Sequence, residues 1–296
     1  MKFIKKHFST LIIIVILLAG LSLLLYPTIS DYWNSFHQTR AIASYVKAVD
    51  NLDKKDYERI WNEARQYNKN LGITGIQTPL SKAKEKEYNK LLDISGNGIM
   101  AYIEIPKIKV SLPIYHGVDE GILQIATGHI AGTSLPVGGK SSHCVISGHR
   151  GLPSARLFTD LDKMTKGDVF MVHVLDKTLT YEVDQIRVVL PDNISDLKIE
   201  DGQDLFTLVT CTPYGVNTHR LLVRGHRIAN IDSASEAADA VRVDTLVVAS
   251  VIAIPVLVML MDFIQRTSRR LAIASERFLA RAPCTAARLT AVGLRS

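Results

Sequence analysis

Cysteine is scarce in this chain of 296 residues, which holds only Cys144, Cys211 and Cys284. Three thiols form at most one bridge, so a disulfide scaffold is excluded. The nine histidines include no HExxH pair, and no CxxC or mixed Cys/His group with metal-ligand spacing occurs, so no metal site is expected. Walker and GxGxxG sequences are absent as well. The sequence therefore predicts a protein that works without a cofactor.

Excess positive charge is missing from the central part of the chain. The net charge is +6 and the pI ≈ 9.1. Three lysines before residue 7, together with the seven arginines and two acids of residues 262–296, contribute +8. The residues between these flanks therefore sum to −2. A nucleic-acid-binding domain needs its positive charge on the folded part, facing phosphate, so nucleic acid is excluded as a partner.

Each basic flank lies beside a long apolar run. The first run, 11–27, is followed by no Ala-x-Ala-like cleavage site, so it predicts an uncleaved transmembrane helix rather than a signal peptide. The second run, 245–264, contains Pro255 and predicts a second transmembrane helix, with a buried core helix as the alternative. Lysines and arginines that flank a span stay on the cytoplasmic side. We therefore expect both termini inside the cell and residues 31–244 outside it.

The first part of this outer region carries helical patterns. Apolar residues recur at helical spacing up to Ala64, which predicts two helices. Glycines and Pro79 then predict an irregular loop over 74–80, and we expect a third helix over 81–92.

From Met100 onward the pattern changes to short β-branched runs bounded by turns. One hairpin turn is expected at Asp176-Lys177, and the apolar phase shifts near Asp184-Gln185, which predicts a bulge. Seven or eight short strands favour a mainly β fold, a barrel or sandwich, over a βαβ sheet. The expected strands cover residues 101–105, 111–115, 144–147, 169–174, 179–189, 205–211 and 220–228.

Chemistry-bearing residues concentrate at two predicted strand ends. One strand ends on Cys211, and Arg220 opens the next strand after a turn; another strand stops at His149, between two glycines. A thiol attacks a carbonyl as its thiolate, and His and Arg are the residues that favour this form and move protons. Cys144 lies inside a strand, so we interpret it as part of the core.

Three segments carry a family resemblance: TLVTCTPYGVNTHR, ISGHRGLPSARLFTDL and GHIAGTSLPVGG. Residues 100–227 resemble the sortases, specifically the class C sortases that assemble pili. The resemblance implies a closed eight-stranded β-barrel with short helices. Class C members typically carry both an N-terminal anchor and a C-terminal membrane segment, which agrees with the two apolar runs.

The resemblance also implies the roles of the site residues. Cys211 is expected to be the nucleophile, His149 the general acid/base, and Arg220 the group that holds the substrate carbonyl and stabilises the oxyanion. Such enzymes cleave an LPxTG-type sorting signal between Thr and Gly, keep the acyl group as a thioester, and pass it to a pilin lysine. The expected partners are therefore pilin subunits and membrane lipid. Residues 190–204 are expected to read the sorting signal.

Neighbouring residues compete for some of these roles. Arg224 shares a strand face with Arg220, so the choice of Arg220 depends on the family spacing. Thr210 could orient substrate through its hydroxyl, with an ordinary strand role as the alternative. Arg150 is interpreted as a surface or structural residue. The histidines near Arg220, His219 and His226, are interpreted as solvent-facing or turn residues.

One family feature is missing. Class C sortases often cover the empty site with a lid that carries Asp-Pro-aromatic, yet Asp-Pro occurs nowhere in this chain. The corresponding loop contains Thr78, Pro79 and Leu80. We predict that it packs over the site through Leu80 without an ionic latch and opens easily. Alternatively, the protein has no working lid and belongs to a neighbouring class.

These features divide the chain into consecutive segments. They are a basic cytoplasmic N-terminus (1–10), a transmembrane helix (11–27), a helical segment with a lid-like loop (28–95), a catalytic barrel (96–230), a linker (231–244), a second transmembrane helix (245–264) and an Arg/Ala-rich cytoplasmic tail (265–296). Two rival functions remain open: a membrane-anchored cysteine hydrolase, and a tethered module that only binds its partners.

Overall fold

The computed structural model describes residues 2–77, 79–230, 261, 264 and 266–268. The predicted linker, the second transmembrane helix and the Arg/Ala-rich tail lie largely outside these residues, and Cys284 lies outside them entirely.

Three helices precede the barrel: α1 (Lys2–Asp50), α2 (Lys54–Thr74) and α3 (Lys82–Tyr88). α1 continues through Pro27, so the apolar run and the first predicted helix are one element. It is the one helix in the described part of the chain that is long and apolar enough to cross a membrane, by length and composition. Asp53 caps α2 by accepting a hydrogen bond from the Asp56 amide at 2.7 Å. Gly75 ends α2 with φ +76°, a conformation that favours glycine.

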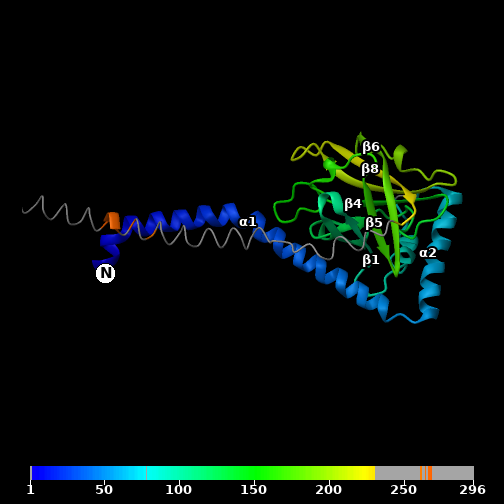
Figure 1. Cartoon of the computed structure of the whole chain (residues 1–296), viewed down its shortest axis with the longest axis horizontal. Coiled ribbons are helices and arrows are strands. Elements are labelled where there is room, and N and C mark those ends of the chain that lie inside the picture. The colour runs from blue at the N-terminus through cyan, green and yellow to red at the C-terminus, as the bar shows by residue number, and fades with distance from the viewer. Residues whose placement is uncertain (1, 78, 231–260, 262–263, 265, 269–296) are drawn as a thin grey trace, which may run out of the picture. The chain divides into compact units, whose positions relative to one another are not determined.

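Eight strands form a closed barrel in the order β1-β2-β3-β4-β7-β8-β6-β5. Figure 1 shows the barrel, with strands β1, β4, β5, β6 and β8 labelled. Two neighbouring pairs are parallel, β2 with β3 and β4 with β7. The strands are β1 (Ile99–Ile105), β2 (Val110–His116), β3 (Thr127–His129), β4 (Ser142–Ser147), β5 (Val169–Val174), β6 (Lys177–Val189), β7 (Asp204–Thr212) and β8 (His219–Ile228). Short helices connect them: η1 (Pro106–Ile108), α4 (Glu120–Leu123), η2 (Leu161–Lys163) and η3 (Ser195–Leu197).

The predicted barrel with short helices is thus confirmed, and each predicted strand lies within an observed one. The sequence missed β3, which has only three residues. The bulge is confirmed, because the β6–β8 register shifts between Val183 and Gln185. The hairpin turn was predicted one residue too late: Val174 pairs with Lys177, and Leu175 enters the turn with φ +53°.

Side chains of the strands alternate between the barrel interior and an outer face. The interior holds Phe170, Tyr181 and Phe206, whose ring centroids lie 5.3–5.7 Å apart. A second, smaller group is buried on the outer face of β4, β6, β7 and β8, and we call it the outer apolar patch. Its members are Val145, Val189, Leu197, Val209 and Leu222.

Candidate active site

Three adjacent strands bring the predicted site residues to one end of the barrel. β7 lies between β4 and β8, and Cys211 pairs with Arg220 across β7 and β8. On the other side, the Gly148 amide donates to the carbonyl of Val209 at 3.1 Å. Opposed residues on neighbouring strands present their side chains on the same face. Cys211 therefore lies between Arg220 on one side and the segment that carries His149 on the other.

The two glycines around His149 are explained by close approaches. A Cβ on Gly148 would lie 2.8 Å from the ring of Phe158, and one on Gly151 would lie 3.1 Å from the ring of Tyr214. Gly151 also has φ +81°, which favours glycine. The carbonyl of His149 accepts a hydrogen bond from the amide of Phe158 at 3.1 Å. The rings of Phe158 and Tyr214 thus leave room only for glycine before and after His149, and they fix the backbone path there.

Of the two roles that the sequence left open for Arg150, surface and structural, the structure favours the structural one. Its side chain is only 8% exposed and pairs with Asp162. It also donates to Oγ1 of Thr212 at 3.2 Å, and its guanidinium carbon lies 5.9 Å from the ring centroid of Tyr214. Arg150 therefore joins the loop after β4 to the loop after β7, which are the loops that follow His149 and Cys211.

Glu120 is a site residue that the sequence did not indicate. Its Oε2 lies 3.5 Å from Nε2 of His149. A hydrogen bond from Gln124 and the nearby His149 hold the pKa of the Glu120 carboxyl below its ordinary value. Glu120 precedes His149 by 29 residues in an unremarkable acidic stretch, and only the barrel closure brings the two together.

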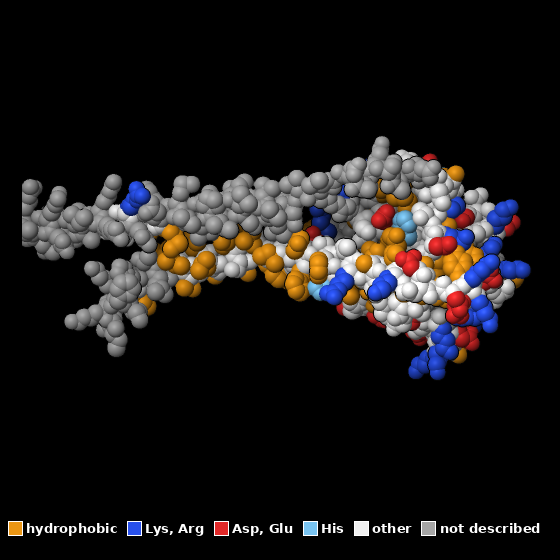
Figure 2. All heavy atoms as spheres, turned by 60° about the horizontal axis from the view of Figure 1, so that its bottom comes forward, with side chains coloured by type: hydrophobic (Ala, Val, Ile, Leu, Met, Phe, Trp, Pro, Cys, Tyr) orange, Lys and Arg blue, Asp and Glu red, His pale blue; other side chains and the backbone are white. Residues whose placement is uncertain are grey.

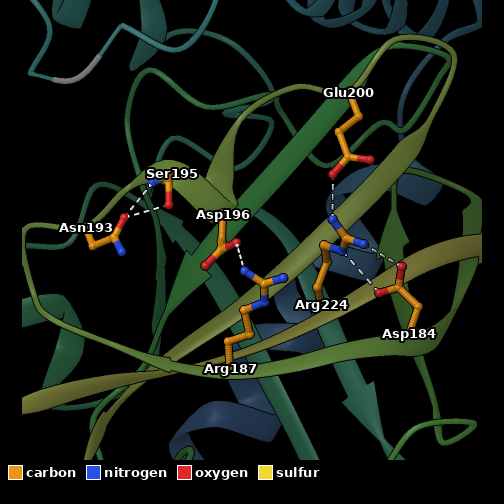
Figure 3. Close-up of polar contacts among 7 residues, drawn as sticks. All are labelled: Asp184, Arg187, Asn193, Ser195, Asp196, Glu200 and Arg224. Carbon is orange, nitrogen blue, oxygen red and sulfur yellow. Dashed lines mark hydrogen bonds and ion pairs between the residues drawn. The ribbon is translucent and has the colours of Figure 1, made fainter.

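The two arginines that share a face of β8, Arg220 and Arg224, have different hydrogen-bond partners. Arg224 donates to both carboxylate oxygens of Asp184, at 3.2 and 2.9 Å, and to Oε1 of Glu200 at 2.6 Å (Figure 3). Arg220 instead donates to two backbone carbonyls, those of Asn217 and His219. Within the part of the chain that the structure describes, no carboxylate forms an ion pair with Arg220. A guanidinium held by carbonyls remains available to an incoming substrate oxygen.

The two described cysteines lie in different environments. Cys144 is fully buried in the barrel interior, and burial raises the pKa of its thiol well above the ordinary value. Cys211 lies on the outer face and is partly exposed. A thiol held neutral by burial is inert, so Cys211 is the better candidate for a nucleophile.

The outer apolar patch adjoins this end of the barrel. Val209 lies two residues before Cys211 on the same face of β7, and Leu222 lies two residues after Arg220 on β8. Ile76 from the loop after α2 packs against the patch, as does Ile130. The patch is thus an apolar surface beside the cysteine, partly covered by the loop after α2.

The connection between β6 and β7 is held against the barrel by charge. Arg187 donates to Asp196 at 2.8 Å, and Arg224 reaches Glu200 (Figure 3). Nδ1 of the buried His143 lies 2.8 Å from the carbonyl of Lys198. This connection, expected from the resemblance to read the sorting signal, therefore has a fixed shape beside the outer apolar patch.

The remaining predicted residues fall at different places. Thr210 is 1% exposed and donates its hydroxyl to the carbonyl of Gly148 at 2.7 Å, so it supports the backbone before His149. Leu80 packs against the main core and Pro79 is exposed, while Thr78 lies outside the described residues. The lid role of this loop remains a prediction, with Ile76 as the residue that contacts the patch.

Comparison with known proteins gives consistent matches. A family model for the sortase domain matches residues 103–228. Sortase C1 from Streptococcus agalactiae has a solved structure that is 53% identical, with a TM-score of 0.64, covering 65% of this chain and 100% of that chain. Sortase C from Streptococcus pneumoniae, described in terms of catalysis and pilin substrate specificity, is 43% identical with a TM-score of 0.59, covering 64% of this chain and 97% of its own.

A more distant relative is sortase D from Bacillus subtilis, 28% identical over 158 residues, which are 52% of this chain and 75% of that protein. The match to the solved sortase C1 is long and close enough to assign the fold and the family together. This chain belongs to the sortase family of cysteine transpeptidases, and its structural relatives are class C sortases.

Proposed function

We propose that this protein is a membrane-anchored transpeptidase that cleaves an LPxTG-type sorting signal between Thr and Gly and transfers the acyl group to a pilin lysine. The observation that carries the proposal is the arrangement of Cys211, His149 and Arg220 at the ends of three adjacent strands, beside an apolar patch. No other thiol among the described residues is exposed.

In the first step Sγ of Cys211, as thiolate, attacks the carbonyl carbon of the sorting-signal threonine. A carbon–sulfur bond forms, and negative charge develops on the carbonyl oxygen. The guanidinium of Arg220 stabilises this charge, and a fixed donor of this kind contributes most in the transition state. The carbon–nitrogen bond to glycine then breaks, and the leaving amine takes a proton from the imidazolium of His149.

In the second step the thioester is passed to an amine. The lysine nitrogen of a pilin attacks the thioester carbon while His149 accepts its proton. The new carbon–nitrogen bond is an isopeptide bond, and the Cys211 thiolate leaves. Splitting one amide exchange into two acyl transfers lowers the barrier of each. These steps use only groups of the chain and its two substrates.

The outer apolar patch supports the substrate part of the proposal. An LPxTG-type segment presents Leu and Pro two or more residues before the scissile bond. Val209 and Leu222 each lie two residues along their strand from Cys211 and Arg220. The connection of residues 190–203 borders the patch with Leu197. The relative from Streptococcus pneumoniae described for pilin substrate specificity favours pilin subunits as the substrates.

Anchoring is proposed from α1 and the charge pattern. The apolar part of α1 is exposed, with Leu23 at 77% and Leu24 at 74%, and basic residues precede it. We infer that residues 11–27 cross the cell membrane and that the barrel lies outside. The proposed domain boundaries follow from this topology, with a second span at 245–264 and both basic ends in the cytoplasm.

The test uses the full chain in detergent micelles with an LPxTG-type peptide, with and without a pilin segment that offers a lysine. We expect an isopeptide-linked product that requires the amine and disappears in Cys211→Ala. Cleavage at the same rate without amine would identify a hydrolase instead. Binding without any reaction, in chains that retain an intact Cys211 thiol, would identify a binding module and contradict the proposal.

A second amine in the same assay addresses the neighbouring class. The loop after α2 lacks the Asp-Pro of class C lids, and this absence supports the alternative of a cell-wall-anchoring sortase. A wall-peptide amine offered in competition with the pilin lysine separates the two. Preference for the lysine supports pilus assembly, and preference for the wall peptide supports anchoring.

A further inference from the structure

α1 meets the barrel just after its apolar part ends. Oδ1 of Asp31 accepts a hydrogen bond from the amide of Arg156, and Nδ2 of Asn34 donates to the carbonyl of Ser154, both at 2.7 Å. One turn later, Nε2 of Gln38 donates to the carbonyl of Ile125, also at 2.7 Å. Three polar side chains on one side of α1 thus hold two loops of the barrel.

Both loops belong to the candidate active site. The first loop contains Ser154 and follows His149. At the far end of this loop, the amide of Phe158 donates a hydrogen bond to the carbonyl of His149. The second contains Ile125 and directly follows α4, where Glu120 lies 3.5 Å from His149. α1 therefore holds the barrel by the two segments that flank His149.

The helix also sets a distance. The apolar run ends at Tyr26, and the three contacts lie 5 to 12 residues further along one uninterrupted helix. At about 1.5 Å per residue this is roughly 8 to 18 Å along the helix axis. If residues 11–27 cross the bilayer, the His149 end of the barrel is the end nearest to the membrane.

Another side of α1 carries an exposed stripe over residues 26–36, which we call the aromatic stripe. Trp33, at the edge of the stripe, also lines a pocket between α1 and the barrel together with Asn34 and Gln38. Tyr26, Ile29, Trp33 and Phe36 follow one another at spacings of three or four residues, which places them on one side of the helix, and Tyr32 lies beside them. Trp and Tyr with one exposed apolar face are typical of the lipid–water interface. The stripe consists of Tyr26, Ile29, Tyr32, Trp33 and Phe36, with exposed fractions of 52–65%. Figure 2 shows hydrophobic side chains gathered along much of α1.

We propose that the lipid–water interface of the bilayer covers the aromatic stripe, and that α1 is a rigid spacer that fixes the height of the active site above the membrane. The inference rests on the proposed anchoring of α1. It goes beyond anchoring because a flexible tether would leave the height of the site undefined, whereas the contacts of Asp31, Asn34 and Gln38 define it. Continuity of the stripe with the apolar run favours lipid over a second copy of the chain as the occupant.

The two tryptophans of the chain, Trp33 and Trp61, give a direct test. The variant Trp61→Phe leaves Trp33 as the reporter, and Trp33→Phe leaves Trp61, on α2, as the matched control. Full-length chains are reconstituted in phosphatidylcholine/phosphatidylglycerol vesicles with nitroxide quenchers at the headgroup. We expect several-fold stronger quenching of Trp33 than of Trp61. Equal quenching of the two, or a Trp33 that is shielded from lipid and cross-links between copies, would overturn the proposal.

A second measurement tests the spacer. Seven helix-forming residues inserted between Pro27 and Thr28 add two turns, about 10 Å. A donor dye on Cys211, in a Cys284→Ser background with Cys144 buried, reports energy transfer to acceptor lipids. We expect the insertion to lower the transfer and to abolish the quenching of Trp33 together. Unchanged transfer would show that α1 does not set the height.

A third measurement tests the hydrogen bonds by which α1 holds the two barrel loops, which we call the docking contacts. Asn34→Ala with Gln38→Ala is expected to lower the energy transfer while quenching of Trp33 stays the same. The matched control is Gln66→Ala with Asn70→Ala, which removes an exposed pair on α2 and is expected to leave both readouts unchanged. Transfer unaffected by the loss of Asn34 and Gln38 would contradict the docking role. Peptide transfer in micelles is measured separately, so failure of the proposed chemistry and failure of the spacer are distinguishable.

Discussion

Two arginines four residues apart on β8 differ in what they bind. Arg224 holds Asp184 and Glu200, while Arg220 faces Cys211 across the strand pair and bonds only to carbonyls. From sequence they are equivalent, because both lie on one face of a strand, and only the position of Asp184 at the bulge separates them. The structural role therefore belongs to Arg224, and the proposed catalytic role to Arg220.

This division gives the first prediction. Arg220→Ala is expected to lower kcat/KM by about 100- to 1000-fold, the loss typical of one oxyanion donor, with little change in the free energy of unfolding. Arg224→Ala is expected to lower the free energy of unfolding by about 1–3 kcal/mol, because two carboxylates lose their partner. Peptide kinetics and urea unfolding on both variants check this. A stable, fully active Arg220→Ala enzyme would refute the assignment.

A buried histidine connects stability to pH. His129 is completely buried; the carbonyl of Ser134 lies 2.8 Å from its Nε2, and the hydroxyl of Tyr88 lies 2.8 Å from its Nδ1. Both contacts are satisfied by a neutral ring that donates at Nε2 and accepts at Nδ1. Burial lowers the pKa of His129 from 6.5 to about 4.

Because burial lowers the pKa of His129, acid is expected to destabilise the protein. The folded protein keeps His129 neutral while the unfolded chain protonates it below about pH 6.5, so acid favours unfolding. Stability should be complete above pH 6.5 and fall by up to about 1.4 kcal/mol per pH unit down to about pH 4. Burial lowers the pKa of His143 as well, which adds to the effect. Urea unfolding across this range checks it, and His129→Gln should flatten the profile while the control His219→Gln should not.

Among the elements, the loop after α2 has the clearest link to the site. Ile76 packs on the outer apolar patch, whose member Val209 lies two residues before Cys211 on β7. Ile73, at the end of α2, is instead 80% exposed. The loop is tied down further by the amide of Gln77, which donates to the carbonyl of Gly132 at 3.1 Å. A substrate that uses the patch must displace Ile76.

The third prediction compares these two isoleucines. Ile76→Ser is expected to raise the rate of thiol labelling at Cys211 about fivefold, since it removes about 1 kcal/mol of apolar contact from the closed loop. Ile73→Ser, which removes no such contact, is expected to leave the rate unchanged. The measurement uses a Cys284→Ser background. Identical labelling rates in the two variants would mean that the loop does not cover the cysteine.

Sequence patterns predicted the strands of this barrel well because β-branched runs and turns are local signals. They missed β3, whose pairing with β2 and β4 depends on long-range contacts, and they placed the hairpin turn beside the true one. That His149 and Cys211 belong to one site was expected only from the family resemblance. Glu120 could not be found from sequence, because its distance from His149 depends on how the loop after β2 folds back.

The helices α1 and α2, which precede β1, are packed into the barrel domain. Tyr45 of α1 is fully buried, donates to the carbonyl of Met100 at 3.0 Å and accepts from the amide of Leu175 at 2.8 Å. Asn68 of α2 bonds to both backbone groups of Leu135. α1 therefore ends inside the fold of the barrel domain.

The packing of α1 into the barrel domain can be tested at Tyr45. Tyr45→Phe keeps the ring but leaves a buried carbonyl and a buried amide without a partner, and such groups cost about 1–3 kcal/mol each. We expect the free energy of unfolding to fall by about 2–6 kcal/mol in urea titrations, because both groups lose their partner. Tyr102→Phe is the control, because Tyr102 lies beside Tyr45 with ring centroids 6.4 Å apart and is partly exposed. If both variants were equally stable, α1 would be a tether rather than part of the domain.

In the proposed reaction the thiol of Cys211 carries the acyl group between two substrates. This step is measured directly as the mass of the chain after brief incubation with an LPxTG-type peptide without amine, followed by acid quenching and peptide mapping. We expect an added mass on Cys211 equal to the peptide acyl group that ends in threonine. This added mass should be retained in Arg224→Lys and lost when a pilin lysine is added. Cleaved peptide with no acyl group on Cys211 at any time would contradict it.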